Sequence, residues 1–369
     1  MPGLRVAMTL EQCWHRVPGG TAAAALGLAG ALAARPDVDV VGVAAAHRSP
    51  PADAWRPPPG VPVRHLPLPR LALYEAWHRL RRPAAEAATG RADVVHATTL
   101  VQPGHRAPLA VTVHDLAFLA DPSHFTAQGR RVLGRGLEIA LAEAAVVLCS
   151  SEATVRACRD AGFDDARLVV VPLAPAPGRD RAVEPGDAPR RHGLDRRYVL
   201  WAGTVEPRKN LRGLLDAWRR LGRDGVDLAL AGPEGWHEDL DALVAGDRSV
   251  RRLGFVPAAD LAALYAGAAA VCYPSLLEGF GLPVLEAMVQ GAPVVTSAGT
   301  ATEELVAGGA GVAVDPRDPD ALAGALAGLL DDPDAARRLG DAGRARAASY
   351  TWERSAGRTV EAYRAAVAR

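Results

Sequence analysis

The chain has 369 residues, and its 42 lysines and arginines balance 42 aspartates and glutamates, so the formal net charge is zero. Balanced charge excludes a global basic field that would attract nucleic acid or an anionic surface, so any anion site must be local. The length exceeds one ordinary hydrophobic core and predicts about two domains.

Cysteine usage and the longest apolar run bear on the cellular compartment. The four cysteines lie far apart without a C-x-x-C pair, which favours buried thiols in a reducing compartment over disulfides or a zinc site. They are Cys13, Cys149, Cys158 and Cys272. The apolar run at 21–34 is too short to span a bilayer, and the charged residues Glu11 and Arg16 before it are wrong for a signal peptide. We therefore expect a cytoplasmic protein.

Short apolar runs alternate with longer segments of helical period in the first half of the chain. This alternation predicts a parallel sheet that is covered by helices on both faces. The expected strands are 4–9, 38–46, 61–66, 92–98, 109–115, 145–150 and 167–172.

A helix is expected at 70–87, where Trp77 and several leucines stand among four arginines. A basic helix with a tryptophan can lie on an anionic membrane, which would make the protein peripheral at the inner face. The alternative is a surface helix whose apolar face belongs to the core.

The segment 172–197 is rich in proline, glycine and charge, which is typical of a linker. A second series of apolar runs follows it, and the tail from 317 reads as helices. We predict an α/β protein with two doubly wound, Rossmann-like domains that face each other across a cleft, with ligands at the carboxyl ends of the strands. The expected divisions are 1–180, a linker at 181–197, and 198–351. The expected second-half strands are 198–203, 226–232, 251–256, 269–274, 292–297 and 311–316.

Two glutamates flank a glycine-rich turn in "LLEGFGLPVLEAM". Pro283 suits the first turn of a helix, which would place Glu286 in that same turn and Glu278 before the turn. Gly279 and Gly281 permit positive φ and close approach of a ligand to the backbone. An anion site at a helix start beside a carboxylate suits a ligand with phosphate and vicinal hydroxyls, such as a sugar nucleotide. The alternative is that Glu286 complements the helix dipole and Glu278 is solvated.

The stretch "WAGTVEPRKNL" ends another expected strand with two adjacent cations, Arg208 and Lys209, before a helix that Asn210 could cap. Two cations at a helix start are unfavourable for the helix dipole unless an anion such as a diphosphate compensates. A solvated basic loop is the alternative.

Other candidates carry weaker signals. His114 and Asp115 leave a strand on opposite faces and are not expected to form a dyad, and His96 has the same strand-end placement. Gly20 opens a helix that Thr21 could cap. The chain has no G-x-G-x-x-G followed by a suitable helix and no P-loop, which argues against a dinucleotide dehydrogenase and a P-loop enzyme. The D-x-D strings at 37–39 and 239–241 are poor metal sites, and we expect no metal.

The stretches "GTVEPRKNL", "YPSLLEGFGLPVLEAMVQGAPVVTS" and "GVAVDP", with looser similarity in "VTVHDLAFL" and "VVLCSSEATVRA", resemble the retaining glycosyltransferases of family 4, which have the GT-B fold. The resemblance implies that Glu286 binds the nucleotide ribose and that Glu278 contacts the donor sugar. It also implies that Lys209 binds the diphosphate and that His114 lies near the donor sugar and acceptor. Further donor contacts are implied for Gly20 and for the backbone of Gly279, Phe280, Gly281 and Leu282.

One position departs from the family pattern. Many members have an arginine six residues before the lysine, where this chain has Gly203, so Arg208 is the candidate for the second cation. The tail helix at 352–369 is expected to pack back on the first domain, as in the family.

The resemblance implies metal-independent transfer of a hexosyl group from a nucleoside diphosphate sugar to a hydroxyl, with retention, in polysaccharide biosynthesis or a related pathway. The leading donor is GDP-mannose, and the acceptor is a glycan, a glycolipid or a small molecule. No cofactor and no nucleic-acid partner are expected. The rival readings are another GT-B enzyme and a non-catalytic sugar-nucleotide-binding subunit of a polysaccharide or lipid assembly.

Overall fold

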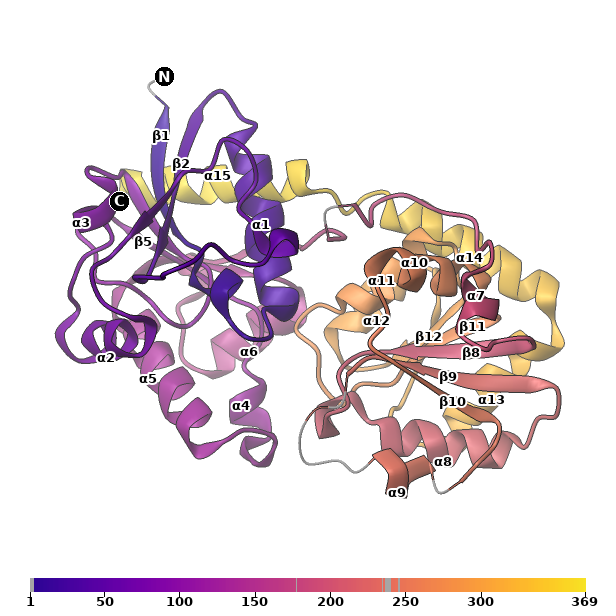
Figure 1. Ribbon diagram of the computed structural model, residues 1–369. Helices are drawn as coiled ribbons and strands as arrows, with labels where there is room; N and C mark the ends of the chain where they lie inside the picture. The colour runs from indigo at the N-terminus through magenta and orange to yellow at the C-terminus, as the bar shows by residue number, and fades with distance from the viewer. Residues whose placement is uncertain (1–2, 177, 234, 236–239, 245) are drawn as a thin grey trace. The chain divides into compact units, whose positions relative to one another are not determined.

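The computed structural model describes residues 3–176, 178–233, 235, 240–244 and 246–369. The chain forms two compact units, Met1–Pro177 with Thr351–Arg369, and Gly178–Tyr350 (Figure 1). Each unit is a parallel sheet with helices on its faces, which confirms the expected α/β class. Within the described ranges, no helix combines the length and the hydropathy that crossing a bilayer requires.

The first unit contains a seven-stranded sheet in the order β3-β2-β1-β4-β5-β6-β7, and every strand pair is parallel. Strands buried on both faces read as continuous apolar runs, which is why the sequence predicts them. In β1, Val6 and Met8 enter the core on one face of the sheet and Ala7 the core on the other. The strands are β1 Leu4–Thr9, β2 Val38–Ala44, β3 Val63–His65, β4 Val94–Ala97, β5 Leu109–Val113, β6 Ala144–Cys149 and β7 Leu168–Val170.

The helices of the first unit come from both ends of the chain. Figure 1 shows α15, in yellow, running beside α1, and the two helices share a core with β1. Trp352 at the start of α15 packs on Gly27, where a Cβ would lie 2.2 Å from the indole ring. The indole Nε1 donates to the carbonyl of Pro175 at 2.8 Å. The helices are α1 Gly19–Ala33, α2 Arg70–Leu80, α3 Glu86–Thr89, α4 Ala117–Ala120, α5 Ala127–Glu143, α6 Glu152–Asp160 and α15 Trp352–Ala368.

A hydrogen-bonded chain also fastens α15 to the sheet. The hydroxyl of Tyr363 lies 2.7 Å from His96 Nδ1, and His96 Nε2 lies 2.7 Å from the hydroxyl of Thr112. Burial lowers the pKa of His96 to about 3, so the imidazole is neutral at physiological pH. His96 is therefore a satisfied core residue.

The helix expected at 70–87 is wrong as a single element. It ends at Leu80, and a short α3 follows after Pro83, because proline lacks an N–H and disfavours helical backbone in the residue before it. Trp77 is 1% exposed, so its ring belongs to the core and does not face a membrane.

The second unit contains a six-stranded parallel sheet in the order β10-β9-β8-β11-β12-β13. The segment 181–197, which was expected as a linker, belongs to this unit and includes α7 Ala188–Arg191. The strands are β8 Arg197–Ala202, β9 Val226–Ala231, β10 Val250–Gly254, β11 Ala270–Tyr273, β12 Val294–Ser297 and β13 Val312–Val314. The other helices are α8 Leu211–Leu221, α9 Leu240–Val244, α10 Ala258–Gly267, α11 Leu282–Val289, α12 Ala301–Val306, α13 Pro319–Asp331 and α14 Pro333–Ala347.

The strand order reverses once in each sheet, between β1 and β4 in the first unit and between β8 and β11 in the second. Loops that leave neighbouring strands at such a switch point diverge to opposite sides and open a crevice at their carboxyl ends. The switch points are therefore where ligand sites are expected.

Candidate active site

The two charged clusters of the second unit follow the two strands that meet at its switch point. β8 pairs with β11 through Val199 with Ala270 and Leu200 with Val271. The loop after β8 carries Arg208 and Lys209, and the loop after β11 carries Glu278. Residues about seventy positions apart in the sequence are thus brought to one edge of the sheet.

Asn210 fixes the loop after β8. Its backbone is left-handed, with φ of 54°, and its side-chain oxygen accepts from the Gly213 N–H at 3.3 Å, which confirms the expected cap of α8. Its amide nitrogen donates to the carbonyls of Pro274 at 3.1 Å and Pro316 at 2.7 Å. One side chain therefore ties together the loops after β8, β11 and β13, and this holds the adjacent cations in place.

Glu278 accepts hydrogen bonds from both cations. Lys209 Nζ lies 2.5 Å and an Arg208 guanidinium nitrogen 3.0 Å from the same oxygen, Oε1. The hydroxyl of Tyr273 donates to that oxygen at 3.2 Å and also contacts Lys209 Nζ. The side chains of Glu278 and Lys209 are 9% and 11% exposed, so the cluster is nearly removed from water.

The cluster controls the charge of its members. Burial alone would raise the pKa of Glu278. The positive charges of Lys209 and Arg208 lower it by more than burial raises it, so the net pKa is about 2. Burial lowers the pKa of Lys209, and the Glu278 carboxylate opposes that shift. Because Glu278 is ionised at neutral pH, it can accept hydrogen bonds from hydroxyl groups but cannot act as a general acid.

Arg208 is held by three acceptors on two loops. Its guanidinium donates to Glu206 at 2.8 Å, to Glu278 and to the carbonyl of Leu277 at 3.0 Å. Gly203 follows β8 and donates its N–H to the carbonyl of Ala231 at 2.9 Å, so this position extends the strand ladder. The structure thus brings Arg208 to Glu278 beside Lys209.

The turn between Glu278 and α11 depends on one glycine with unusual backbone. Gly281 has φ of 101°, and a Cβ there would lie 2.5 Å from Thr302 Cγ2. The positive φ that the sequence predicts for this turn is present at Gly281. The Phe280 ring packs edge-on against Tyr350, with the ring centroids 5.9 Å apart. Leu282 begins α11.

Glu286 lies deeper in α11 than the sequence predicts. The helix begins at Leu282, so Glu286 is its fifth residue and not part of the first turn. This correction weakens the alternative in which Glu286 only complements the helix dipole. Its Oε2 accepts from the Arg179 guanidinium at 2.8 Å, and its side chain is 8% exposed.

The candidate residues of the first unit follow β1 and β5, Gly20 in the first turn of α1 and His114 directly after β5. α1 begins at Gly19, with Pro18 before it, so Gly20 is exposed in the first turn. The expected cap at Thr21 is wrong, because its hydroxyl instead donates to the carbonyl of Pro18 at 3.3 Å.

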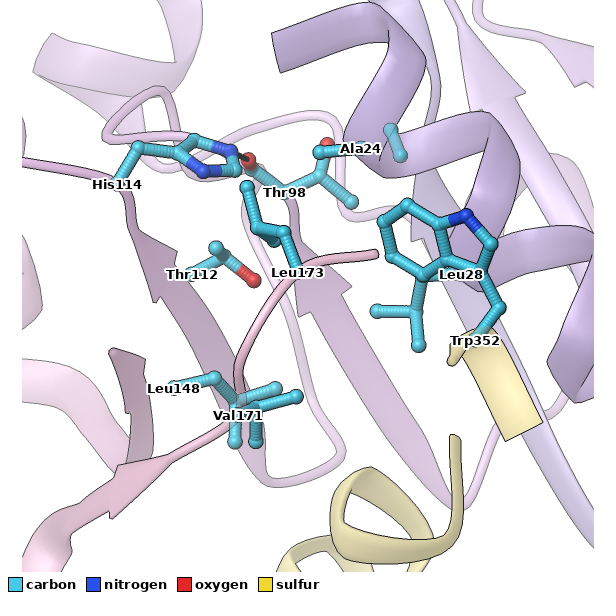
Figure 2. Close-up of a pocket in the computed structure, with 10 residues that line it drawn as sticks. Ala24, Leu28, Thr98, Thr112, His114, Leu148, Val171, Leu173 and Trp352 are labelled. Atoms are coloured by element: carbon cyan, nitrogen blue, oxygen red, sulfur yellow. Dashed lines mark hydrogen bonds between the residues drawn. The ribbon is translucent and has the colours of Figure 1, made fainter. Parts of the chain in front are cut away.

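His114 lines a small cavity among β4, β5, α1 and the start of α15 (Figure 2). Its Nε2 lies 3.1 Å from the carbonyl of Thr98, so Nε2 carries the proton, and burial lowers its pKa. Asp115 instead accepts from the Ala117 N–H at 3.0 Å, in line with the expectation of no dyad. The cavity holds about 20 Å³, room for about one water molecule.

Among the residues that the structure describes, no three histidine, cysteine or acidic side chains cluster closely enough to hold a metal ion. Asp37 of the first D-x-D string pairs with Arg35 and Arg364, and Asp239 of the second lies outside the described residues. All four cysteines are buried with free thiols, as expected.

Comparison with known proteins identifies the family. A family model described as "Glycosyltransferase Family 4" matches residues 18–179, and one described as "Glycosyl transferases group 1" matches residues 196–332. The chain is 35% identical over 317 residues to O-antigen chain mannosyltransferase B of Escherichia coli, covering 82% of this chain and 81% of that protein. The chain belongs to glycosyltransferase family 4.

Two further comparisons concern the enzyme class and the fold. The chain is 40% identical over 189 residues to MMP alpha-(1->4)-mannosyltransferase of Mycolicibacterium hassiacum, covering 49% of this chain and 46% of that protein. The crystal structure of Anabaena HepE in complex with UDP and glucose superposes with a TM-score of 0.74 at 20% identity, covering 97% of this chain and 98% of HepE. The expected GT-B fold and glycosyltransferase class are therefore confirmed.

Sequence reasoning missed four residues of the second-unit site. Tyr273 contacts Lys209, and Glu206 accepts a hydrogen bond from Arg208. Arg179 donates to Glu286 in α11, and Gln290, which follows α11, accepts from the Val183 N–H. Arg179 lies in a stretch of low complexity that gave no periodic signal. Glu206 was visible in "VEPRKN", where an acid two residues before an arginine could have been taken as its partner.

Proposed function

We propose that this family 4 enzyme transfers a mannosyl group from GDP-mannose to a hydroxyl of a glycan, glycolipid or small molecule, with retention of the anomeric configuration. The observation that carries the proposal is the buried Glu278, held ionised between Lys209 and Arg208 at the switch point of the second sheet. The mannosyl choice draws support from two relatives named as mannosyltransferases. The choice of a nucleoside diphosphate sugar draws support from HepE, which was crystallised with UDP and glucose.

In this proposal, each part of the donor has a matching group. The ribose hydroxyls bind Glu286, and the sugar hydroxyls bind the Glu278 carboxylate. The diphosphate lies at the N-terminus of α11, where the backbone from Gly279 to Leu282 offers N–H groups, and near Lys209. Arg208 supplies the second cation, because this chain has Gly203 where many family members have an arginine. In the first unit, Gly20 is proposed to contact the diphosphate.

The chemical step breaks the bond between the anomeric carbon and the diphosphate oxygen, and the electron pair leaves with the diphosphate. Lys209 and Arg208 stabilise the negative charge that develops there, in a site with little water. The acceptor hydroxyl attacks from the face that the diphosphate leaves, and its proton passes to the departing phosphate oxygen. Retention follows because attack and departure share one face. We propose His114 as a hydrogen-bonding group near the donor sugar and acceptor, and this mechanism requires no metal.

Peripheral contact with an anionic membrane is part of the proposal only for a glycolipid acceptor at the cytoplasmic face. With Trp77 in the core, the exposed apolar residues of α2 are Leu71, at 64%, and Leu80, at 70%. Flotation with anionic and with neutral liposomes tests this contact. Recovery that does not depend on anionic lipid removes the membrane from the proposal.

The experiment that tests the function is calorimetric titration with GDP-mannose and with UDP-, dTDP- and ADP-sugars, without added metal. We expect GDP-mannose to bind, and we expect slow release of mannose from it when no acceptor is present. Binding of another base class would replace the proposed donor. A folded protein that binds none of the panel would contradict the proposed donor site.

A further inference from the structure

A segment at the start of the second unit lies across α11 and is held there by side-chain hydrogen bonds. Gln290 comes four residues after Glu286, so the two side chains project from the same side of the helix axis. The Gln290 amide nitrogen donates to the carbonyl of Arg181 at 2.8 Å, and its oxygen accepts from the Val183 N–H at 2.8 Å. Gln290 is 4% exposed and thus binds this backbone as a neighbouring strand would.

Arg179 lies two residues before the first of these anchors and reaches Glu286. Its guanidinium donates to Oε2 at 2.8 Å, and its side chain is 32% exposed against 8% for Glu286. Both side chains line a small crevice together with Leu261 and Tyr265 of α10. Burying a carboxylate this far from water costs free energy unless a charged or hydrogen-bonding partner compensates, and Arg179 provides one.

The chemistry of a ribose explains why this matters for the donor. Two vicinal hydroxyls need two acceptor sites in a fixed arrangement, and an ionised carboxylate offers about four, whereas a protonated one offers fewer and adds a donor. A charge-assisted hydrogen bond from a guanidinium restricts the orientation of the carboxylate as well as its charge. Glu286 held in this way is prepared for the diol before the donor arrives.

We propose that Arg179 is a positioning residue for donor binding, which holds the Glu286 carboxylate in the orientation that accepts both ribose hydroxyls of a nucleoside diphosphate. Gln290 supports Arg179 by fixing the backbone that carries it. The inference rests on the proposed function, in which Glu286 binds the ribose. Nothing in the sequence pattern pairs positions 179 and 286, which are 107 residues apart.

The test compares wild type, Arg179→Ala, Arg179→Lys and Arg181→Ala by calorimetric titration with GDP, UDP and ADP, each beside its 2′,3′-dideoxy analogue. Arg181→Ala is the matched control, because the exposed Arg181 side chain is lost while the carbonyl that Gln290 binds remains. Thermal unfolding of each variant establishes that it is folded. The ratio of affinities for the nucleotide and its dideoxy analogue isolates the ribose contact from the diphosphate contact.

We expect Arg179→Ala to weaken binding of the preferred nucleotide roughly ten- to a hundredfold, the loss of about one charge-assisted hydrogen bond. Binding of the dideoxy analogue should change little, so the preference for the diol falls. Arg179→Lys should restore part of that preference, and Arg181→Ala should match wild type. In turnover, the KM for the donor should rise more than kcat falls.

The other outcomes overturn the inference. Wild-type affinity and diol preference in Arg179→Ala would mean that the ion pair is only structural. Tighter nucleotide binding in Arg179→Ala would mean that Arg179 obstructs Glu286. Wild type that binds none of the three nucleotides would overturn the proposed function and the inference with it, whereas wild-type binding without any diol preference would remove Glu286 as the ribose ligand.

Discussion

The charge state of Glu278 is set by its neighbours, and this makes the roles of those neighbours testable one at a time. Lys209→Ala removes the cation closest to Oε1 and leaves Arg208 and Tyr273 beside the carboxylate. We expect donor turnover to fall by roughly a hundred- to a thousandfold, as when one preorganised electrostatic contact to a transition state is lost. Steady-state kinetics of sugar release measures the effect, and Arg190→Ala, on the exposed end of α7, is the charge-matched control. Turnover within twofold of wild type would contradict the electrostatic role of Lys209.

The same cluster predicts how stability depends on acid. The pKa of Glu278 is lowered from an ordinary value of 4.5 to about 2, because the effect of Lys209 and Arg208 exceeds the opposing effect of burial. A lowered carboxyl pKa contributes stability that is fully present above the unfolded pKa and is lost as pH falls through the folded pKa. The free energy of unfolding should therefore decrease between about pH 4.5 and about pH 2. Denaturant titrations should show a shallower decrease for Glu278→Gln, and an unchanged slope would refute this assignment.

At the scale of elements, the turn that starts α11 shows how one glycine determines the course of the chain. Gly281→Ala combines left-handed backbone with a Cβ 2.5 Å from Thr302 Cγ2. We expect a loss of about 1–3 kcal/mol in the free energy of unfolding. Gly308→Ala, with φ of 73° and no atom within 4 Å of the added Cβ, is a control that carries the backbone strain alone.

A second substitution separates the contact from the strain in that turn. Adding Thr302→Ser to Gly281→Ala removes Cγ2 but keeps the hydroxyl that bonds Thr296 at 2.8 Å. The double variant should recover part of the lost stability, because only the close contact is relieved. Equal destabilisation of Gly281→Ala and Gly308→Ala, with no recovery in the double variant, would mean that the contact with Thr302 has no effect.

The elements differ in how well the sequence predicts them, for physical reasons. Strands buried on both faces are continuous apolar runs, so their number and their positions in the sequence could be read directly, with bounds off by a few residues. The bounds of the helix expected at 70–87 could not be read in this way. The helical periodicity of the sequence continues through Pro83, whereas the helical backbone ends at Leu80. The position of Glu286 within α11 was also misjudged, since Gly281 and not Pro283 marks where the helix begins.

For the whole molecule, the site depends on proximity that sequence spacing does not encode. The resemblance to family 4 indicated Glu278 and Lys209 as separate site residues. The hydrogen bond from Lys209 to Oε1 of Glu278 follows only from the order of β8 and β11 in the sheet. Arg179 lay beyond prediction for a further reason. Arg179 is placed beside Glu286 by the course of the chain as it enters the second unit. Hydrogen bonds from Gln290 fix that course, and the stretch they bind has no repeating sequence pattern from which the contact could be predicted.

The attachment of α15 to the first unit should become sensitive to acid at a higher pH than the Glu278 cluster does. Burial lowers the pKa of His96 from 6.5 to about 3, so stability is fully present above the unfolded pKa and is lost as pH falls from about 6.5 toward 3. The decrease should approach about 1.4 kcal/mol per pH unit for this one group. Calorimetry of His96→Gln should show a shallower dependence between about pH 6.5 and about pH 4.5, above the range in which Glu278 contributes. A slope equal to that of wild type would contradict the assignment to His96.

The first unit is built from two stretches of sequence, with the second unit inserted between them. During synthesis, residues 178–350 are therefore complete and able to fold while the face of α1 at Leu26 and Gly27 still lacks Trp352, Val360 and Tyr363. The apolar face of α1, which is made before the second unit, must stay uncovered until α15 leaves the ribosome. That interval is when the nascent protein is most exposed to aggregation and to chaperone binding.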